Sequence, residues 1–299
     1  TSGSGQIKRA IGVVPFDIPA GQIVGFLGPN GAGKTTTLHL VLGLTRPTSG
    51  SIQVLGHDAT KAGNAVRHQI GYLPDVPGFP AWMTAPEFLR FAGSLFGIDK
   101  ATLDSRVDSL LELAGLTGVN HKIGGFSRGM KQWLGATQAL VNAPKLLMLD
   151  EPTSALDPLG RKDVLTMIEA LRGKATVLFS THLLDDVERI CDSAVVLNQG
   201  HVLATGTITQ LRSRYDGAQK MRLVTDGGTA HVSALLEDEA WVGDVTIGGD
   251  AVVFAADNAD RVGKALLGFL ASASLTLREY GPALFTLEDA FVLLTEEDR

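Results

Sequence analysis

Short apolar runs alternate with stretches of helical spacing along the first two thirds of the chain. Such runs are typical of strands buried on both faces of a largely parallel sheet. They cover residues 22–28, 51–55, 70–73, 146–149, 176–180 and 194–198. Apolar residues recur at helical spacing in 34–44 and through most of 84–140. The pattern therefore predicts an α/β fold with a mainly parallel central sheet and a helical insert at about 84–140.

The pattern changes near residues 213–220, and a smaller unit follows. Strands are expected at 221–225, 242–247, 251–255 and 275–280, and helices near 233–237, at 259–271 and at 286–295. The order β-α-β-β-α-β with a last helix predicts a small α+β domain of the split βαβ type. We place the boundary so that residues 1–216 form the first domain and residues 217–299 form an accessory domain.

The two predicted domains differ in charge. The chain has 299 residues and a net charge of −6, and 44% of its residues are hydrophobic, enough for a substantial core. Residues 217–299 carry 14 Asp and Glu against 6 Lys and Arg, a net charge of −8. An acidic segment repels phosphate backbones, which argues against nucleic-acid binding by the C-terminal part.

A few features report on the cellular compartment. The single cysteine, Cys191, excludes an internal disulfide framework and suits a reducing compartment. We expect it to be a small core residue, with a reactive thiol as the alternative. The first ten residues contain no apolar signal-peptide region, and the apolar-rich stretch 265–277 is too short to span a bilayer. We therefore expect a chain that is soluble by itself.

The sequence GPNGAGKT at 28–35 matches the phosphate-binding pattern G-x-x-x-x-G-K-[ST]. Its glycines allow a tight turn whose amides point at phosphate, Lys34 supplies a cation for the β- and γ-phosphates, and the Thr35 hydroxyl suits Mg²⁺. The motif lies between a predicted strand and a predicted helix, whose positive end faces the same place. We infer a nucleotide site, with a generic glycine-rich turn as the alternative.

Two acidic residues follow the apolar run at 146–149. A strand that ends at Asp150 places a carboxylate at the C-terminal edge of the sheet, where it suits the coordination shell of Mg²⁺. Glu151, the next residue, can orient or polarise an attacking water. The alternative is a pair of acids that only solvates a strand end.

His182 follows another apolar run, at the same predicted edge of the sheet. An imidazole there can touch the γ-phosphate of a bound nucleotide. The alternative is an N-terminal helix residue with no ligand.

The segment GGFSRGMKQW, residues 124–133, looks like a loop that runs into a helix. It contains no obvious catalytic group. A serine followed by free backbone N–H groups at a helix start can hold an anion, so Ser127 is a candidate anion contact.

Taken in order, these motifs resemble the ATP-binding subunits of ABC transporters over roughly residues 11–212. The resemblance rests on GPNGAGKTT, the signature-like FSRGM (126–130), LLMLDE (146–151), SALD (154–157) and STH (180–182). It implies a P-loop NTPase fold with a mainly parallel sheet and antiparallel edge strands. The variant SRGMKQ and the acidic α+β tail look more like the drug-export branch, whose partners are ABC-2-type permeases.

The resemblance implies a role for each matching residue. ATP would be held by Gly28, Pro29, Asn30, Gly31, Ala32, Gly33, Lys34, Thr35 and Thr36, and Mg²⁺ by Thr35, Asp150 and Asp75. Glu151 would be the catalytic carboxylate, and His182 would contact the γ-phosphate and sense hydrolysis. Asp157 would lie at the contact with a second nucleotide-binding subunit, identical or paralogous. Ser127, Arg128, Gly129 and Met130 would cap the ATP of that subunit.

The sequence departs from the family pattern at several positions. Asp75 stands where Gln is common, which puts additional negative charge beside the triphosphate. No Tyr or Trp precedes Tyr72 to stack on adenine, and Phe16 is expected to pack inward. Arg128 replaces a common Gly and would pair with phosphate, pair with an acid across the dimer, or stay solvated. Trp133 replaces a common Arg and is expected in the core, with partner contact as the alternative.

The resemblance implies a motor subunit at the cytoplasmic face of the cell membrane. Two chains would sandwich two ATP molecules and drive a permease, docked near 75–83, that exports a substrate. One rival is a soluble ABC-type ATPase that acts on nucleic acid or ribosomes, against which the single cassette, the lack of heptads and the acidic tail argue. A second rival is a subunit that binds ATP without hydrolysing it, against which Glu151 argues.

Overall fold

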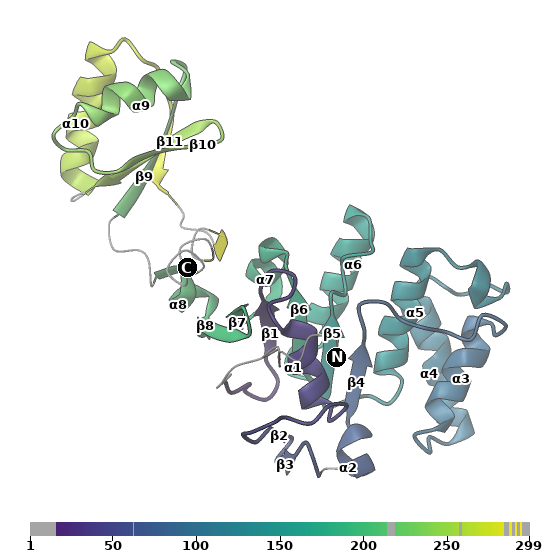
Figure 1. The fold of residues 1–299 in the computed structure, drawn as a ribbon. Coiled ribbons are helices and arrows are strands. Elements are labelled where there is room, and N and C mark those ends of the chain that lie inside the picture. The colour runs from purple at the N-terminus through teal and green to yellow at the C-terminus, as the bar shows by residue number, and fades with distance from the viewer. Residues whose placement is uncertain are drawn as a thin grey trace, which may run out of the picture. The chain divides into compact units, whose positions relative to one another are not determined.

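We describe a computed structural model of the chain, covering residues 16–61, 63–213, 219–256, 259–283, 287, 288, 291 and 294. The chain divides into two compact units (Figure 1). One comprises Thr1–Ile208 with Leu294–Arg299, and the other comprises Thr209–Leu293. The predicted boundary between 216 and 217 lies outside the described residues. Within the described ranges, no helix is long and apolar enough to cross a membrane.

A six-stranded sheet forms the centre of the first unit, in the order β4-β5-β6-β1-β7-β8. All neighbours in it are parallel except β7 and β8, so the prediction of a mainly parallel sheet with an antiparallel edge is confirmed. The strands are β1 (Ile23–Leu27), β4 (Ile70–Leu73), β5 (Leu146–Asp150), β6 (Thr176–Thr181), β7 (Ser193–Asn198) and β8 (His201–Thr207).

One predicted strand is not part of this sheet. Within the predicted run 51–55, only β2 (Gln53–Val54) is extended, and it pairs with β3 (His57–Asp58) in a small antiparallel hairpin. Leu55 has φ 50° and Gly56 has φ 80°, so the chain reverses after two residues. The left-handed backbone at Leu55 therefore ended a strand that the apolar run predicted to be longer.

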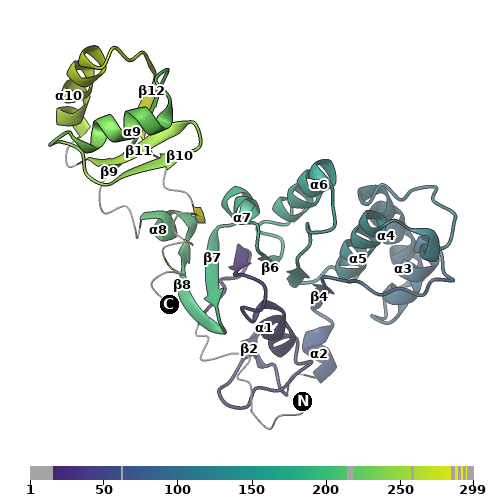
Figure 2. The ribbon, with the colours of Figure 1, turned by 45° about the horizontal axis from the view of Figure 1, so that its top comes forward.

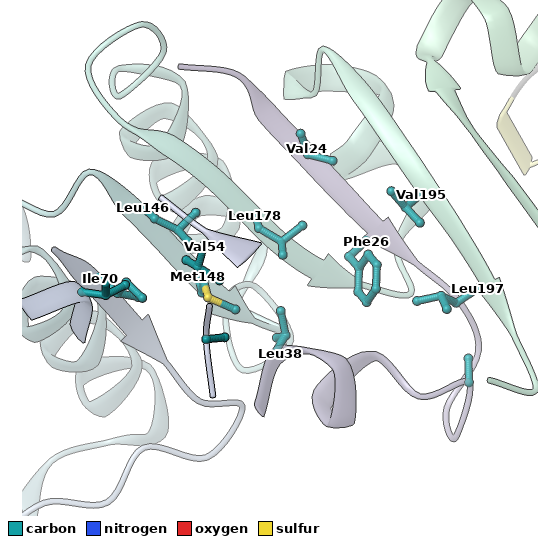
Figure 3. Packing of buried hydrophobic residues seen from close by; sticks show 13 residues of the cluster. Val24, Phe26, Leu38, Val54, Ile70, Leu146, Met148, Leu178, Val195 and Leu197 are labelled. Carbon is teal, nitrogen blue, oxygen red and sulfur yellow. The ribbon is translucent and has the colours of Figure 1, made fainter. Parts of the chain in front are cut away.

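Helices pack on this sheet and bury the apolar strand residues. They are α1 (Lys34–Val41), α2 (Gly63–Arg67), α6 (Pro158–Glu169) and α7 (Leu184–Ile190). The short helix α8 (Ile208–Ser213) begins where the first unit ends. Figure 3 shows Phe26 of β1, Met148 of β5 and Leu178 of β6 on the side of the sheet that faces Leu38 of α1, with Val24 further back along β1 in the same cluster. This cluster fixes the start of α1 against the carboxyl end of β1, where the glycine-rich segment lies.

Three helices form the predicted insert: α3 (Ala85–Ser94), α4 (Lys100–Leu113) and α5 (Arg128–Leu140), with a 3₁₀ turn η1 (Ile123–Gly125) before α5. A capping box between Thr84 and Glu87 starts α3, and the side chain of Asp99 caps α4. The insert has its own buried core, against which the half-buried Trp133 packs. The expectation that Trp133 belongs to a core is therefore confirmed.

The second unit is a four-stranded antiparallel sheet with two helices over one face (Figure 2). Along the chain it runs β9 (Gln219–Thr225), α9 (Thr229–Glu237), β10 (Val245–Gly248), β11 (Ala251–Ala256), α10 (Ala259–Ser272) and β12 (Leu277–Pro282). The spatial order β10-β11-β9-β12 is that of the predicted split βαβ fold. The predicted helix at 286–295 falls largely outside the described residues.

Candidate functional site

The segment between β1 and α1 is shaped by its glycines. Gly31 and Gly33 have φ of 83° and 104°, a left-handed backbone that side chains disfavour. A Cβ added at Gly28 would lie 2.5 Å from the carbonyl oxygen of Leu197. Helix α1 starts after Gly33 with no side-chain cap, so its first amides face the loop without a protein side-chain acceptor. This geometry fits an anion at the helix start, as the sequence motif predicts.

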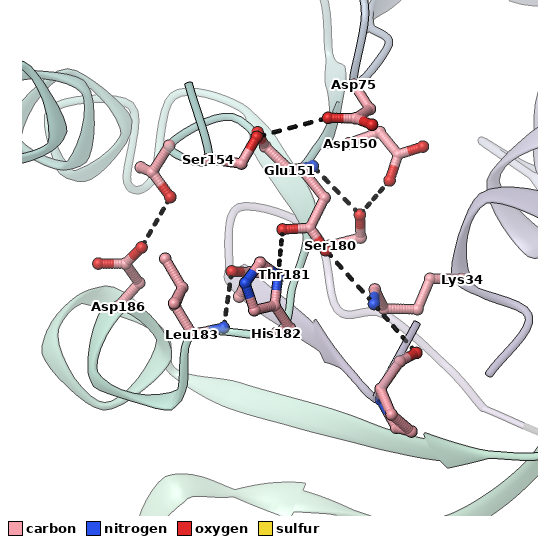
Figure 4. A network of polar contacts seen from close by, with 12 residues as sticks. Lys34, Asp75, Asp150, Glu151, Ser154, Ser180, Thr181, His182, Leu183 and Asp186 are labelled. Carbon is pink, nitrogen blue, oxygen red and sulfur yellow. Dashed lines mark hydrogen bonds and ion pairs between the residues drawn. The ribbon is translucent and has the colours of Figure 1, made fainter. Parts of the chain in front are cut away.

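Lys34 places its ammonium group inside the loop. Its side chain is only 7% exposed, and Nζ donates to the carbonyl oxygens of Gly28 at 2.7 Å and Pro29 at 3.4 Å. The same Nζ lies 3.3 Å from Oε1 of Glu151 (Figure 4). The structure therefore brings together the cation of the first motif and the second acid of the apolar run.

Asp150 lies at the carboxyl end of β5 and is 1% exposed. Its Oδ2 accepts a hydrogen bond from Thr35 Oγ1 at 2.7 Å, and its Oδ1 accepts one from Ser180 Oγ. Two of the three predicted magnesium ligands, Thr35 and Asp150, are thus in contact. A hydroxyl and a carboxylate are hard oxygen donors of the kind Mg²⁺ prefers, and the ion takes its remaining ligands from phosphate and water. The residues present therefore fit that ion.

Asp75, the third predicted ligand, makes a different contact. It is exposed in the loop after β4, and its Oδ1 accepts a hydrogen bond from Ser154 Oγ at 3.4 Å. Burial, Asp150 and Asp75 together raise the pKa of Tyr72 to about 12, so both carboxylates act on the same phenol. Among the described residues, no group of three or more His, Cys, Asp or Glu side chains could hold a metal by itself.

Glu151 has a left-handed backbone, and the two oxygens of its carboxylate have different surroundings. Its φ is 48°, and its amide donates to the carbonyl oxygen of Ser180 at 3.0 Å. Its Oε2 lies 2.9 Å from Nδ1 of His182, whereas its buried Oε1 has no hydrogen-bond partner and faces Lys34 only as an ion pair. A buried carboxylate oxygen without a hydrogen bond is available to another donor, such as a water molecule.

The segment Ser127–Met130 lies at the start of α5. Ser127 is the N-cap, and its Oγ accepts from the amide of Met130 at 3.2 Å, as expected of a capped helix start. Arg128 is exposed, and Gly129 is half-buried. No hydrogen bond or ion pair between described residues joins this segment to the glycine-rich loop. Asp157 is likewise exposed and caps α6 through the amide of Gly160 at 2.8 Å.

Phe16 and Cys191 were both expected to be core residues rather than parts of the site. Phe16 packs against Phe26, with ring centroids 5.6 Å apart, and joins the core beneath the sheet. It therefore packs inward, as expected. Burial raises the pKa of the Cys191 thiol well above its usual range, which disfavours the reactive thiolate and supports the expected core role.

Four residues near the site were not assigned a role from the sequence. The hydroxyl of Ser180 donates a hydrogen bond to Asp150, and the hydroxyl of Ser154 donates one to Asp75. The buried Asp186 accepts from Thr153 Oγ1 at 2.8 Å and from Arg161 Nε at 2.7 Å. The buried Gln132 donates to the carbonyl of Pro152 at 3.3 Å. Gln132 and Asp186 could have been noticed in the sequence because each is a polar residue on the otherwise apolar face of a helix.

Comparisons with known proteins agree with the motifs. The family model described as ABC transporter matches residues 11–154. The chain is 40% identical to an uncharacterized ABC transporter ATP-binding protein, YxlF, of Bacillus subtilis, over 95% of this chain and 94% of that protein. It is 35% identical to Nod factor export ATP-binding protein I of Rhizobium meliloti, over 96% and 84%. A solved structure described as the ATP binding subunit of an ABC transporter matches with a TM-score of 0.65 and 34% identity, over 69% of this chain and 87% of that one.

Proposed function

The chain belongs to the family of ABC transporter ATP-binding proteins, and we propose that it is the motor subunit of an exporter. Members of this family bind ATP and hydrolyse it. Export is supported by the relative named for Nod factor export, which matches 96% of this chain. The nature of the exported substrate is set by the membrane partner, to which the substrate binds.

The observation that carries the proposal is the meeting of Lys34, Glu151 and His182 at one edge of the sheet. Glu151 lies 3.3 Å from Lys34 Nζ and 2.9 Å from His182 Nδ1, so one carboxylate contacts a cation and an imidazole. Three segments far apart in the sequence converge on the place where the γ-phosphate of ATP would lie. An array of this kind suits phosphoryl transfer, which depends on positioning and on charge stabilisation.

Each residue then has a chemical task in the proposal. The amides at the start of α1 and the ammonium of Lys34 bind the phosphates. Glu151 orients the attacking water and accepts its proton, and His182 contacts the γ-phosphate from the other side. Thr35 and Asp150, assisted by Asp75, would hold Mg²⁺, which when bound neutralises charge on the β- and γ-phosphate oxygens.

A second nucleotide-binding subunit completes the site in this proposal. Ser127 and the Gly129 amide at the start of α5 would cap the ATP that is bound to the other chain, and Asp157 would lie at the contact. This arrangement is supported by the exposure of Ser127, Arg128 and Asp157, because side chains that are exposed in the single chain are free to contact a second one. Two chains would close around two ATP molecules and open again after hydrolysis.

The proposed membrane partner is an ABC-2-type permease, docked on the loop between β4 and α3. Val76 and Trp82 in this loop are 76% and 73% exposed, while Phe79 between them packs against the insert. Large exposed apolar side chains on a partly anchored loop suit a protein interface. The chain would then lie at the cytoplasmic face of the membrane. None of the comparisons favours the rival role on nucleic acid or ribosomes.

The test is the Glu151→Gln variant, assayed with the permease complex purified from membranes. The amide keeps the shape of the side chain but is a poor proton acceptor, so ATP binding should persist while turnover falls at least about 100-fold. In a separate measurement on the chain without the permease, the ATP-bound pair of nucleotide-binding subunits should accumulate, as seen by size-exclusion chromatography. Unchanged ATPase activity in Glu151→Gln would refute the proposed role of this residue.

A further inference from the structure

Gln132 is a polar residue buried inside the contact between α5 and the sheet. Its side chain is 1% exposed, and it follows Ser127 by five residues on the same helix. Its Nε2 donates a hydrogen bond of 3.3 Å to the carbonyl oxygen of Pro152, the residue directly after Glu151. Burial of a side-chain amide is costly unless the amide is hydrogen-bonded. The bond to Pro152 therefore offsets part of the cost of burying Gln132.

The backbone that Gln132 holds is strained. Glu151 is not glycine, yet its φ is 48°, and such a conformation is unfavourable for a side chain and persists only when the surroundings determine it. Ser154 bonds the carbonyl oxygen of Glu151 from within the same loop, and three contacts from other elements hold this segment in place. Ser180 of β6 accepts from the Glu151 amide at 3.0 Å, Asp186 of α7 accepts from Thr153 Oγ1 at 2.8 Å, and Gln132 of α5 donates to Pro152.

Of these three contacts, the one from Gln132 comes from the helix that begins at Ser127. The other two come from β6, which pairs directly with β5, and from α7, which follows β6 in the chain. We propose that Gln132 is a positioning residue for Glu151, and that its bond to Pro152 transmits displacements of α5 to the catalytic carboxylate. The inference rests on the proposed function, in which the start of α5 contacts the ATP of a second subunit.

The consequence is coupling between the two ATP sites within a single chain. Contact of Ser127 with the ATP on the second subunit fixes the start of α5, and the Gln132–Pro152 bond then fixes the backbone of Glu151 at the chain's own ATP. Each site would reach full activity only when the other is occupied. In equilibrium terms, Gln132 contributes a coupling free energy between the two nucleotides.

The variant Gln132→Met tests this proposal, because methionine has nearly the same length but no N–H donor. The matched control is Thr137→Val on the same helix, which removes a buried hydroxyl that bonds only within α5, to Leu134. In the purified transporter complex, kcat of Gln132→Met should fall about tenfold, with KM for ATP within about twofold of the original. The Hill coefficient for ATP should fall toward 1. Thr137→Val should change none of these quantities.

Several results would overturn the inference. An unchanged kcat and Hill coefficient in Gln132→Met would show that the bond does not position Glu151, and equal losses in both variants would show a general packing effect. If Gln132→Met does not fold, Gln132→Leu supplies the same test, because leucine is also apolar and has no hydrogen-bond donor. A failure of the proposed function is distinguishable, since Glu151→Gln would then leave ATPase activity unchanged.

Discussion

The ammonium nitrogen of Lys34 lies 3.3 Å from Oε1 of Glu151, so the cation of the glycine-rich loop and the carboxylate after β5 hold each other in place. Both side chains are largely buried, at 7% and 12% exposed, which strengthens their attraction over that of a surface pair. Bound phosphate competes for the same ammonium group. ATP binding should therefore weaken the ion pair between Lys34 and Glu151 and leave the Glu151 carboxylate available to other groups.

Replacement of Lys34 by Ala should weaken ATP binding. The variant loses a charge-assisted contact to phosphate, and we expect an affinity about 10- to 100-fold lower. Isothermal titration with ATP measures this, with exposed Lys174→Ala as the control for loss of one positive charge. Full affinity in Lys34→Ala would remove this residue from the binding site.

Replacement of His182 by Ala should lower turnover more than binding. The imidazole contacts Glu151 Oε2 and lies at the proposed γ-phosphate position, so we expect kcat to fall about 100-fold. Steady-state ATPase assays give kcat and KM separately. The exposed His201 on β8 supplies the control His201→Ala, and a kcat of His182→Ala equal to that of this control would contradict the role.

Asp75→Asn tests the third proposed magnesium ligand. The amide keeps an oxygen but loses the negative charge, so the Mg²⁺ concentration that gives half-maximal ATPase activity should rise about 3- to 10-fold. The control is Asp108→Asn, an exposed residue of α4. An unchanged Mg²⁺ dependence would assign Asp75 to its contact with Ser154 alone.

Asp186→Ala should destabilise the first unit. Asp186 is 1% exposed and accepts bonds from Thr153 and Arg161, and its loss leaves a half-buried guanidinium without its carboxylate. We expect the free energy of unfolding to fall by about 2–4 kcal/mol. Urea unfolding followed by circular dichroism measures it, with exposed Asp163→Ala on α6 as control. A loss no greater than that of the control would mean that the pair is not stabilising.

Much of the candidate site follows from the sequence because a parallel sheet leaves few alternatives. Strands buried on both faces must be apolar runs, and their carboxyl ends share one edge, so Asp150 and His182 could be placed beside the glycine-rich loop in advance. The split βαβ order of the second unit was equally readable from alternating runs and helical spacing.

The rest depends on contacts that no local pattern encodes. Nothing near Gln132 in the sequence indicates that α5 crosses the loop after β5 closely enough to bond Pro152. The pairing of Asp186 with Arg161 likewise joins two helices whose relative placement is set by the sheet. At 51–55 the apolar run predicted a longer strand, but backbone geometry at Leu55 and Gly56 produced a hairpin instead.

The order of strands in the central sheet also determines at what stage of synthesis the sheet can form. β1 lies between β6 and β7, so the strand that leads into the glycine-rich loop pairs with segments more than 150 residues later in the chain. During synthesis, β1 emerges from the ribosome early, but its neighbour β6 is complete only at Thr181 and its neighbour β7 only at Asn198. Pairing over such separations slows folding and leaves apolar strands open to aggregation. The newly made chain therefore cannot assemble its ATP site until about two thirds of it exists.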